Sequence, residues 1–213
     1  MEQDFAAERK LMVAHQLRGH GISDRRVLEA FESVPRHLFV PEEYRSAAYE
    51  DGPLPIGFQQ TISQPFVVAY MTQLLDLAGS ERVLEVGTGS GYQAAILSAL
   101  TAEVHTIELI PALADRARAV FEQLGLRNIF LHVGDGSLGW ADSAPYDAIM
   151  VTAAGPRVPK SLLGQLADDG RMVLPVGERG DQVLELWRRE GEQFTHETLL
   201  PVAFVPLRGK EGV

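Results

Sequence analysis

Three glycines at a spacing of two follow a short apolar run and constrain the fold of this chain more than any other feature. The run at 83–86 reads Val-Leu-Glu-Val, and Gly87, Gly89 and Gly91 come after it. The run predicts a buried strand, and residues 93–100 predict a helix that leaves the turn. Glycine is needed where the backbone takes a positive φ or approaches a ligand closely. Strand, glycine turn and helix together predict the first unit of a nucleotide-binding α/β domain.

The spacing of the glycines narrows the class of ligand. A dinucleotide-binding fingerprint needs its third glycine at position 92, where this chain has Tyr92. The chain also lacks any Tyr-x-x-x-Lys pair. Both observations disfavour a nicotinamide-dependent oxidoreductase. The pattern that is present runs from Glu85 to Gly91 with a glycine at every second position after the glutamate, and a glycine-rich turn without a ligand is the structural alternative.

Two further polar positions follow predicted strands. Glu108 ends the strand 103–108, 17 residues after the last glycine of the turn. A carboxylate there is placed to accept hydrogen bonds from both ribose hydroxyls of a nucleoside, and the alternative is an exposed side chain. The strand 128–133 precedes Gly-Asp-Gly at 134–136, at the edge of the sheet where α/β proteins bind ligands. We expect Asp135 to accept a hydrogen bond from an adenine amino group.

A segment rich in proline and glycine precedes the glycine turn. Residues 52–64 predict a rigid, irregular loop. Pro65 then opens an apolar segment with helical spacing that ends near Gly79. Thr61 and Ser63 therefore lie close to a helix N-terminus, where free N–H groups and the macrodipole favour an anion. We expect a carboxylate site there, and the alternative is that Ser63 only caps the helix.

Strands and helices alternate through the rest of the chain. Further helices are expected at 5–18, 24–34, 41–45, 111–124 and 159–166, and further strands at 146–152, 171–176, 183–187 and 198–205. The alternation predicts an α/β fold with a mostly parallel twisted sheet, right-handed crossovers and helices on both faces, closed by an antiparallel hairpin. We expect one domain over 1–213, with a helical lead-in at 1–79 that carries the loop 52–64, a ligand-binding core at 80–177 and C-terminal strands at 178–213.

The composition excludes several classes of function. The net charge is −10, from 19 Lys and Arg against 29 Asp and Glu, which disfavours nucleic acid as a partner. Without cysteine, disulfides and thiolate metal sites are impossible. The start, Met-Glu-Gln-Asp at 1–4, lacks the features of a signal peptide, and the apolar run 66–71 is far shorter than the roughly 20 residues of a membrane span. We therefore expect a cytoplasmic protein that binds neither nucleic acid nor membranes. We also expect a monomer, although the composition does not give the oligomeric state.

Seven segments together resemble the protein-L-isoaspartate O-methyltransferase family. They are Leu-Pro-Ile-Gly-Phe-Gln-Gln-Thr-Ile-Ser-Gln-Pro at 54–65, Val-Leu-Glu-Val-Gly-Thr-Gly-Ser-Gly-Tyr-Gln at 83–93, Gly-Asp-Gly at 134–136, Ala-Pro-Tyr-Asp-Ala-Ile at 144–149, Leu-Pro-Val-Gly at 174–177, Val-Pro-Arg-His at 34–37 and Phe-Val-Pro-Leu at 204–207. The resemblance spans nearly the whole chain, and the first segment is the most specific. The chain departs from the family at Gln59, where a second loop glycine often stands, and the tail 208–210 is not matched to the family residue by residue.

The resemblance implies a Rossmann-like methyltransferase fold and a protein repair activity. The enzyme would move a methyl group from S-adenosyl-L-methionine to the α-carboxylate of L-isoaspartyl residues in damaged proteins and peptides, leaving S-adenosyl-L-homocysteine. The ester would cyclise to a succinimide that hydrolyses partly to aspartyl, and D-aspartyl sites would be weaker substrates. Ser63 would be the catalytic residue that orients the carboxylate, with Thr61 and Ile62 as further substrate contacts. The implied cofactor contacts are Glu85, Val86, Gly87, Thr88, Gly89 and Gly91 at the methionine end, Glu108 at the ribose, and Asp135 and Gly136 at the adenine.

This chemistry agrees with the residue patterns of the chain. A carboxylate is ionised at pH 7, with an ordinary pKa of roughly 3.5 to 4, so no general base is required. A sulfonium is a strong leaving group, so neither a metal ion nor a covalent nucleophile is required. The sequence has no Ser/His/Asp constellation and no His-Glu-x-x-His pattern, and we expect His37 and His132 to be structural.

Two other interpretations remain open at this stage. A different methyltransferase would act on a small molecule or on RNA; the acidic balance counts against RNA, and the Thr-Ile-Ser loop counts against both. A binding module with the same fold would hold the cofactor or a peptide without turnover. Cofactor binding without methyl transfer to any carboxylate would favour the binding module.

Overall fold

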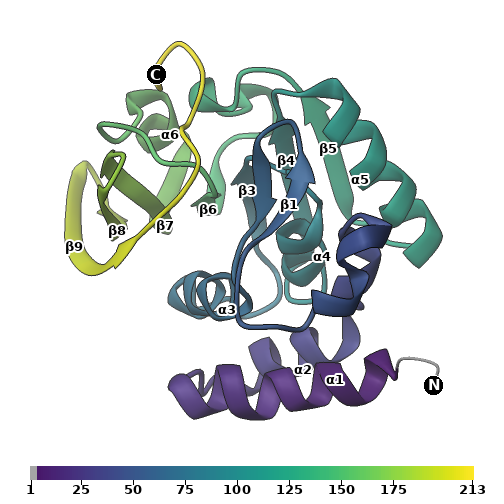
Figure 1. Ribbon diagram of the computed structural model, residues 1–213. Helices are drawn as coiled ribbons and strands as arrows, with labels where there is room; N and C mark the ends of the chain where they lie inside the picture. The colour runs from purple at the N-terminus through teal and green to yellow at the C-terminus, as the bar shows by residue number, and fades with distance from the viewer. Residues whose placement is uncertain (1–3) are drawn as a thin grey trace.

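A seven-stranded sheet forms the centre of the computed structural model, which describes residues 4–213 (Figure 1). The strand order is β5-β4-β3-β6-β7-β8-β9, with β3 (Arg82–Val86), β4 (Glu103–Glu108), β5 (Ile129–Val133), β6 (Tyr146–Val151), β7 (Leu166–Glu178), β8 (Asp181–Glu190) and β9 (Gln193–Val202). The first five strands in this order pair in parallel, and β8 and β9 are added through antiparallel pairs, β7 with β8 and β8 with β9, which confirms the predicted sheet. Residues 1–3, on which the signal-peptide expectation partly rests, lie outside the described residues.

The direction of winding reverses at β3. This strand pairs with β4 on one side and β6 on the other, so that Val83 lies opposite both Val104 and Ala148. The chain passes outward from β3 through β4 and β5, then returns to β6 on the far side of β3. The crevice outside the carboxyl ends of β3 and β6 is therefore a topological switch point, the place where open α/β sheets bind ligands.

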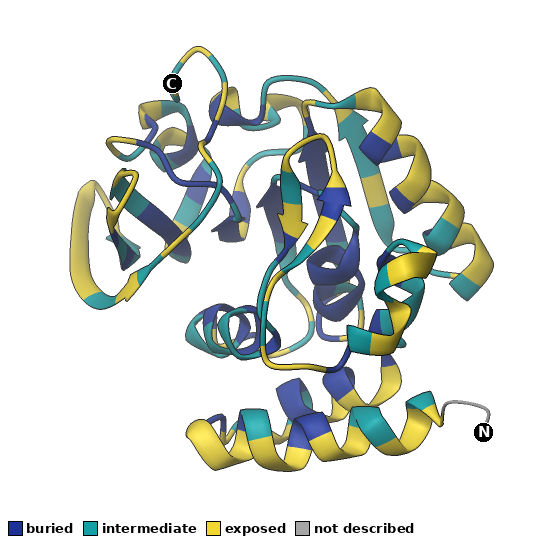
Figure 2. Ribbon diagram, viewed as in Figure 1, coloured by how far each residue is buried: buried dark blue, intermediate teal, exposed yellow. Residues whose placement is uncertain are grey.

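Helices cover both faces of the sheet, as predicted. On one face lie α3 (Pro65–Leu74), α4 (Tyr92–Ser98) and α5 (Pro111–Leu124), and on the other lies α6 (Lys160–Gln165). Because strand side chains alternate, Val83 packs into the first core and its neighbour Leu84 into the second. Figure 2 shows β3, β4 and β6 buried between the two layers.

The N-terminal lead-in is helical but less regular than the sequence predicts. Helix α1 (Phe5–Leu11) continues as a π-helix, η1 (Met12–Leu17), and a 3-10 turn, η2 (Arg18–His20), rather than as one α-helix over 5–18. It is followed by α2 (Arg25–Ser33), η3 (Arg36–Phe39) and η4 (Glu42–Ala47). Asp24 caps α2 by accepting hydrogen bonds from two backbone N–H groups. No helix within the described residues is long and apolar enough to cross a membrane.

The predicted irregular loop 52–64 is instead largely a β-hairpin, so this prediction was wrong. Strands β1 (Leu54–Gly57) and β2 (Gln60–Ile62) pair in antiparallel fashion outside the main sheet. Phe58 and Gln59 form the two-residue turn, with φ of 52° and 60°. Both strands of a two-stranded ribbon are edge strands. Pro55 is therefore tolerated in β1, because the missing N–H can face the edge that pairs with no other strand.

The C-terminal strands also differ from the prediction in their ends. β7 begins directly after α6 and is longer than the predicted 171–176, whereas β9 ends at Val202 rather than at 205. The short 3-10 turns η5 (Gly136–Leu138) and η6 (Ala141–Ser143) follow β5. Residues 203–205, predicted as strand, belong to an extended segment that returns along the open end of the sheet.

Candidate active site

A cavity opens at the carboxyl ends of β3 and β6. Its walls come from the glycine turn with the strand end before it (85–90), the end of β4 (107–110), the hairpin (60–63) and the C-terminal segment (204–208). The predicted site residues that line it are Thr61, Ile62, Ser63, Glu85, Val86, Gly87, Thr88, Gly89, Glu108 and Gly136. Two predicted residues, Gly91 and Asp135, do not line it. Figure 1 shows the hairpin and the C-terminal segment on the near side of the sheet.

The glycines of the turn differ in what surrounds them. Gly91 has φ of 89°, and the first atom of a side chain there would lie 2.7 Å from the ring of Phe121 on α5. The packing of the turn against α5 therefore requires this glycine. At Gly89, with φ of 54°, a side chain would make only an ordinary contact with Ile56 at 3.5 Å. Gly89 thus leaves space that belongs to the cavity and not to the protein core.

Glu85 presents a carboxylate oxygen with no partner. The side chain is fully buried, and its Oε2 accepts a hydrogen bond of 2.5 Å from the hydroxyl of Thr106. Its Oε1 is buried and has no hydrogen-bond partner among the described residues. Burial raises the pKa of Glu85 to about 8, opposed by the Thr106 hydrogen bond and reinforced by the charge of Glu108. An orphaned carboxylate oxygen in a cavity wall fits a cationic donor such as the ammonium group of an amino acid.

Glu108 is held by the backbone on both of its oxygens. Oε2 accepts a hydrogen bond of 2.7 Å from the N–H of Gly89, and Oε1 accepts one of 2.9 Å from the N–H of Ile110. The residue is buried, which rules out the alternative of an exposed carboxylate. Each carboxylate oxygen retains a second acceptor site, so a fixed Glu108 can accept two hydroxyl donors of a ribose.

Asp135 lies beside the cavity and anchors the C-terminal tail. Its Oδ1 accepts hydrogen bonds from the N–H and the hydroxyl of Ser137, at 2.9 and 2.7 Å. Its Oδ2 accepts one of 2.8 Å from the N–H of Lys210. Three of about four acceptor sites are thus used, and one remains for a ligand donor. Its neighbour Gly136 lines the cavity directly, packed against Val86. The adenine contact of Asp135 stays a prediction.

Ser63 lies just before α3, but it is not the cap of that helix. The N-cap is Gln64, whose side chain makes no capping bond. Within the described residues the hydroxyl of Ser63 has no hydrogen-bond partner, and its carbonyl accepts a bond of 2.8 Å from Nη2 of Arg36. Thr61 is exposed and Ile62 is buried beside it. Ser63, at the end of the hairpin, therefore lines the cavity with an uncommitted hydroxyl, and the hydrogen bond from Arg36 fixes its backbone.

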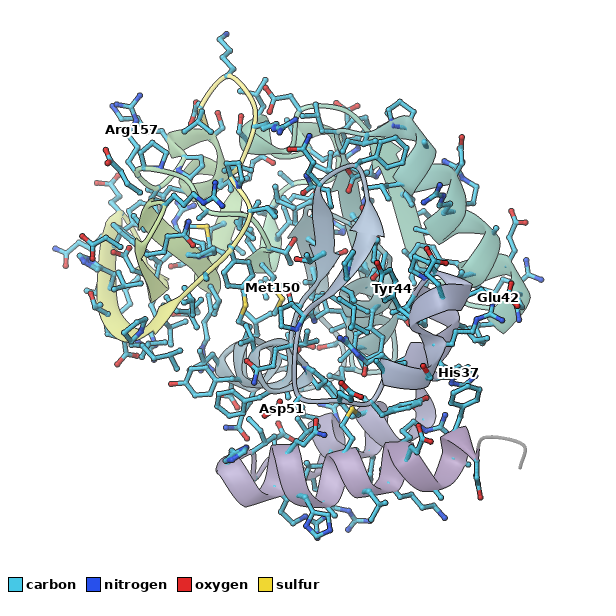
Figure 3. The ribbon with its side chains drawn as sticks, viewed as in Figure 1. His37, Glu42, Tyr44, Asp51, Met150 and Arg157 are labelled. Carbon is cyan, nitrogen blue, oxygen red and sulfur yellow. The ribbon has the colours of Figure 1, made fainter. Side chains whose placement is uncertain are left out.

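The two histidines expected to be structural lie outside the cavity. His37 lies beside the N-terminal helices (Figure 3), stacked on Phe5 at 4.1 Å, and its Nδ1 is 2.8 Å from the hydroxyl of Tyr49. Burial lowers the pKa of His37. His132 stacks on Trp140 at 4.0 Å and is also absent from the cavity lining. Neither ring is placed to act on a ligand bound in the cavity.

Comparison with known sequences decides the family. A family model described as protein-L-isoaspartate(D-aspartate) O-methyltransferase matches residues 7–212 of this chain. The chain belongs to the protein-L-isoaspartate O-methyltransferase family. A relative of that name from Syntrophotalea carbinolica is 52% identical over 210 residues, which cover 98% of this chain and 97% of the relative.

Solved structures agree on the fold of this family member. A protein-L-isoaspartate O-methyltransferase superposes with a TM-score of 0.88 at 29% identity, covering 96% of this chain and 67% of the other. A second, from Plasmodium falciparum, is described as a putative protein-L-isoaspartate O-methyltransferase in complex with S-adenosyl-L-homocysteine. It superposes with a TM-score of 0.81 at 22% identity over 97% of this chain and 99% of the other, a likeness that concerns the fold alone. The Rossmann-like fold predicted for a methyltransferase of this family is therefore confirmed.

Sequence reasoning missed several residues that build the site of this methyltransferase. Thr106 holds Glu85, but only the register that places Glu85 opposite Thr106 on the neighbouring strand identifies it. Thr152 donates hydrogen bonds to the carbonyls of Val86 and Gly87 and so fixes the turn. Arg36 holds the backbone of Ser63 from 27 positions away. No local sequence pattern identifies these residues, because each contact joins segments that are distant in the sequence.

Proposed function

We propose that this chain is a repair enzyme that transfers the methyl group of S-adenosyl-L-methionine to the α-carboxylate of L-isoaspartyl residues in damaged proteins and peptides. One observation carries the proposal: the same cavity has a buried, unpartnered carboxylate oxygen on Glu85 and an unpartnered hydroxyl on Ser63. The first suits the cationic amino acid end of the cofactor, and the second suits an anionic acceptor. Membership of the family supports the same reaction.

The glycine turn and the two glutamates would hold the cofactor. Glu85 would accept from the ammonium group through Oε1 while Thr106 keeps its other oxygen in place. The space at Gly89 would admit the ligand next to the backbone, and Glu108 would accept from the ribose hydroxyls. Val86, Gly87, Thr88 and Gly91 would shape the turn, and Asp135 and Gly136 would flank the adenine. Bound S-adenosyl-L-methionine supplies a methyl group on a positively charged sulfur, which a carboxylate oxygen can attack directly.

The hairpin would hold the acceptor. Ser63 would donate its hydroxyl to one oxygen of the isoaspartyl α-carboxylate, with Thr61 and Ile62 completing the contact. That carboxylate is ionised at neutral pH, with an ordinary pKa of roughly 3.5 to 4, so it needs no proton acceptor. The work of these residues is to align the acceptor oxygen with the methyl carbon and to exclude water. The methyl ester would then cyclise to a succinimide, and hydrolysis would return part of it to aspartyl.

The proposal has a cellular part as well. We propose a cytoplasmic monomer with one domain, divided as the sequence predicts into 1–79, 80–177 and 178–213, and without nucleic-acid or membrane partners. The net charge of −10 supports the exclusion of nucleic acid, because a phosphate backbone is also anionic. Light scattering after size-exclusion chromatography tests the monomer, and an observed dimer would contradict it.

The activity can be tested with two peptides that differ only in having isoaspartyl or aspartyl at one position. Each is incubated with the enzyme and methyl-labelled S-adenosyl-L-methionine. We expect base-labile label on the isoaspartyl peptide alone. Label on neither peptide, with cofactor binding confirmed by calorimetry, would keep the methyltransferase fold but remove the proposed substrate.

A further inference from the structure

The wall of the cavity formed by the C-terminal segment 204–208 ends in a cation. Arg208 lines the cavity, and among the lining residues, all of them described, it has the one Lys or Arg side chain. The lining also includes two carboxylic acids, Glu85 and Glu108. Arg208 begins the tail 208–210, which the segments that carry the family resemblance do not include. The resemblance therefore implies no role for Arg208, and a role has to be inferred from its surroundings in the structure.

The backbone on both sides of Arg208 is fixed. Leu207 is buried, its N–H donates to the carbonyl of Ala154 at 2.8 Å, and its own carbonyl accepts from Val213 at 2.8 Å. On the other side, the N–H of Lys210 donates to Asp135 at 2.8 Å. The chain is thus held one residue before Arg208 and two residues after it, so the backbone of Arg208 is fixed at the wall of the cavity.

The side chain of Arg208 is uncommitted, unlike those of two other arginines near the cavity. Arg36 donates to the carbonyl of Ser63 and Arg116 donates to the carbonyl of Ile56. Arg208 is exposed and forms no ion pair or hydrogen bond with any residue of the described range 4–213. Its donors are available to a ligand in the cavity.

An anionic acceptor needs such a cation here. The protein carries a net charge of −10, and Glu108 lies in the same cavity, so both the global and the local charge oppose a carboxylate. A guanidinium offsets this repulsion, because it is always charged and donates charge-assisted hydrogen bonds to a carboxylate oxygen. A neutral acceptor would gain less from it, because its carbonyl oxygen can accept a hydrogen bond but forms no ion pair.

We propose that Arg208 is a substrate-binding residue that selects the anionic form of the acceptor by pairing with its carboxylate from the C-terminal wall of the cavity. The inference rests on the proposed function and assigns the substrate discrimination of that same site. Arg208 engages one oxygen and leaves the other free to react. Methylation converts the acceptor into a neutral ester, so the ion pair is lost with the product and does not hold it in the cavity.

The test measures discrimination between a charged and a neutral ligand. KM and kcat are determined for an isoaspartyl peptide, together with inhibition by the matched isoasparaginyl peptide, in which a neutral amide replaces the α-carboxylate. The proteins are the wild type, Arg208→Leu, Arg208→Lys and the control Arg179→Leu. Arg179 is exposed in the turn between β7 and β8, away from the cavity lining, and its loss changes the net charge equally.

We expect Arg208→Leu to raise KM for the isoaspartyl peptide about 5- to 20-fold, between the effect of an exposed ion pair and that of a desolvated charged hydrogen bond. Inhibition by the isoasparaginyl peptide and cofactor affinity should not change. Arg208→Lys should recover part of the loss, and Arg179→Leu should behave as the wild type. An unchanged KM, or equal losses for both peptides, overturns the role. If the wild-type enzyme methylates no isoaspartyl peptide, the proposed function is wrong, and the role proposed for Arg208 is then wrong as well.

Discussion

The guanidinium of Arg36 donates a hydrogen bond of 2.8 Å from Nη2 to the carbonyl oxygen of Ser63. Arg36 is fully buried, donates a second bond of 2.8 Å to the carbonyl of Ala48, and lies 4.9 Å from the ring centre of Tyr92. Burial lowers the pKa of Arg36 to about 10, so the side chain stays charged at neutral pH. One buried cation therefore joins the end of the β1–β2 hairpin to the helix that leaves the glycine turn.

Replacing Arg36 by methionine should loosen the hairpin. Arg36→Met removes the donor from the buried carbonyl of Ala48 and from the partly buried carbonyl of Ser63, so we expect the free energy of unfolding to fall by about 2 to 3 kcal/mol. KM for an isoaspartyl peptide should rise more than the Kd of the cofactor. Urea unfolding and steady-state kinetics measure both. The control is Arg25→Met, which removes an exposed i,i+4 ion pair with Glu29. It should change neither the free energy of unfolding nor the KM for the peptide. A fully stable Arg36→Met protein would contradict the role.

The buried Glu85 should make the cofactor-free protein less stable at alkaline pH. Burial raises its pKa to about 8 from 4.5, so its contribution to stability is complete below pH 4.5 and is lost as the pH rises through 8. The loss is on the order of 5 kcal/mol. The glutamine of Glu85→Gln cannot ionise, so this variant should be more stable than the wild type at about pH 9. The two proteins should be equally stable near pH 4.5, the ordinary pKa of the glutamate. The variant should bind S-adenosyl-L-methionine more weakly.

Thermal unfolding at the two pH values and calorimetry of cofactor binding test this prediction. A wild type that is more stable than Glu85→Gln at the alkaline pH would show that Glu85 is not protonated in the empty cavity. Equal cofactor affinity in the two proteins would remove Glu85 from the binding site.

Two of the three glycines of the turn, Gly89 and Gly91, should respond differently to alanine. Gly91→Ala places a methyl group against the ring of Phe121 and should destabilise the fold severely. Gly89→Ala meets only an ordinary contact with Ile56, so it should remain folded at a cost of about 1 to 2 kcal/mol for its positive φ. Its methyl group should nevertheless abolish measurable cofactor binding by calorimetry. A folded Gly89→Ala protein with undiminished affinity would refute the assignment of the turn.

Ser63 should matter for turnover and not for the cofactor. Ser63→Ala removes the uncommitted hydroxyl from the hairpin, and we expect kcat/KM for an isoaspartyl peptide to fall about 10-fold or more with the Kd of S-adenosyl-L-methionine unchanged. Ser33→Ala, at the end of α2 and outside the cavity lining, is the matched control. Turnover equal to the wild type would transfer the role to Thr61 or to the backbone.

The parts of this fold that local sequence signals specify were predictable. The apolar run before Gly87 and the capping residue Asp24 each act through neighbours in the chain, and their elements appear where expected. The hairpin was not predictable, because a two-residue turn with positive φ at both positions is signalled by glycine or asparagine. Phe58 and Gln59 occupy those positions with φ of 52° and 60° and give no such signal.

Part of the site was also beyond the sequence. Glu85, Glu108 and Ser63 could be located because each follows or precedes a recognisable element. Arg208 could not, because the return of the C-terminal segment to the cavity depends on contacts with Ala154 and Asp135 that only the folded sheet brings together.

The central claim is that the methyl group goes to the α-carboxylate of an isoaspartyl residue. The most direct measurement follows one isoaspartyl peptide by tandem mass spectrometry during incubation with enzyme and S-adenosyl-L-methionine. We predict a single added methyl group localised to the α-carboxylate of the isoaspartyl residue, followed by the succinimide and by growing amounts of the aspartyl peptide. A peptide that stays unmethylated while the cofactor is bound, or a methyl group on any other atom, would contradict the account.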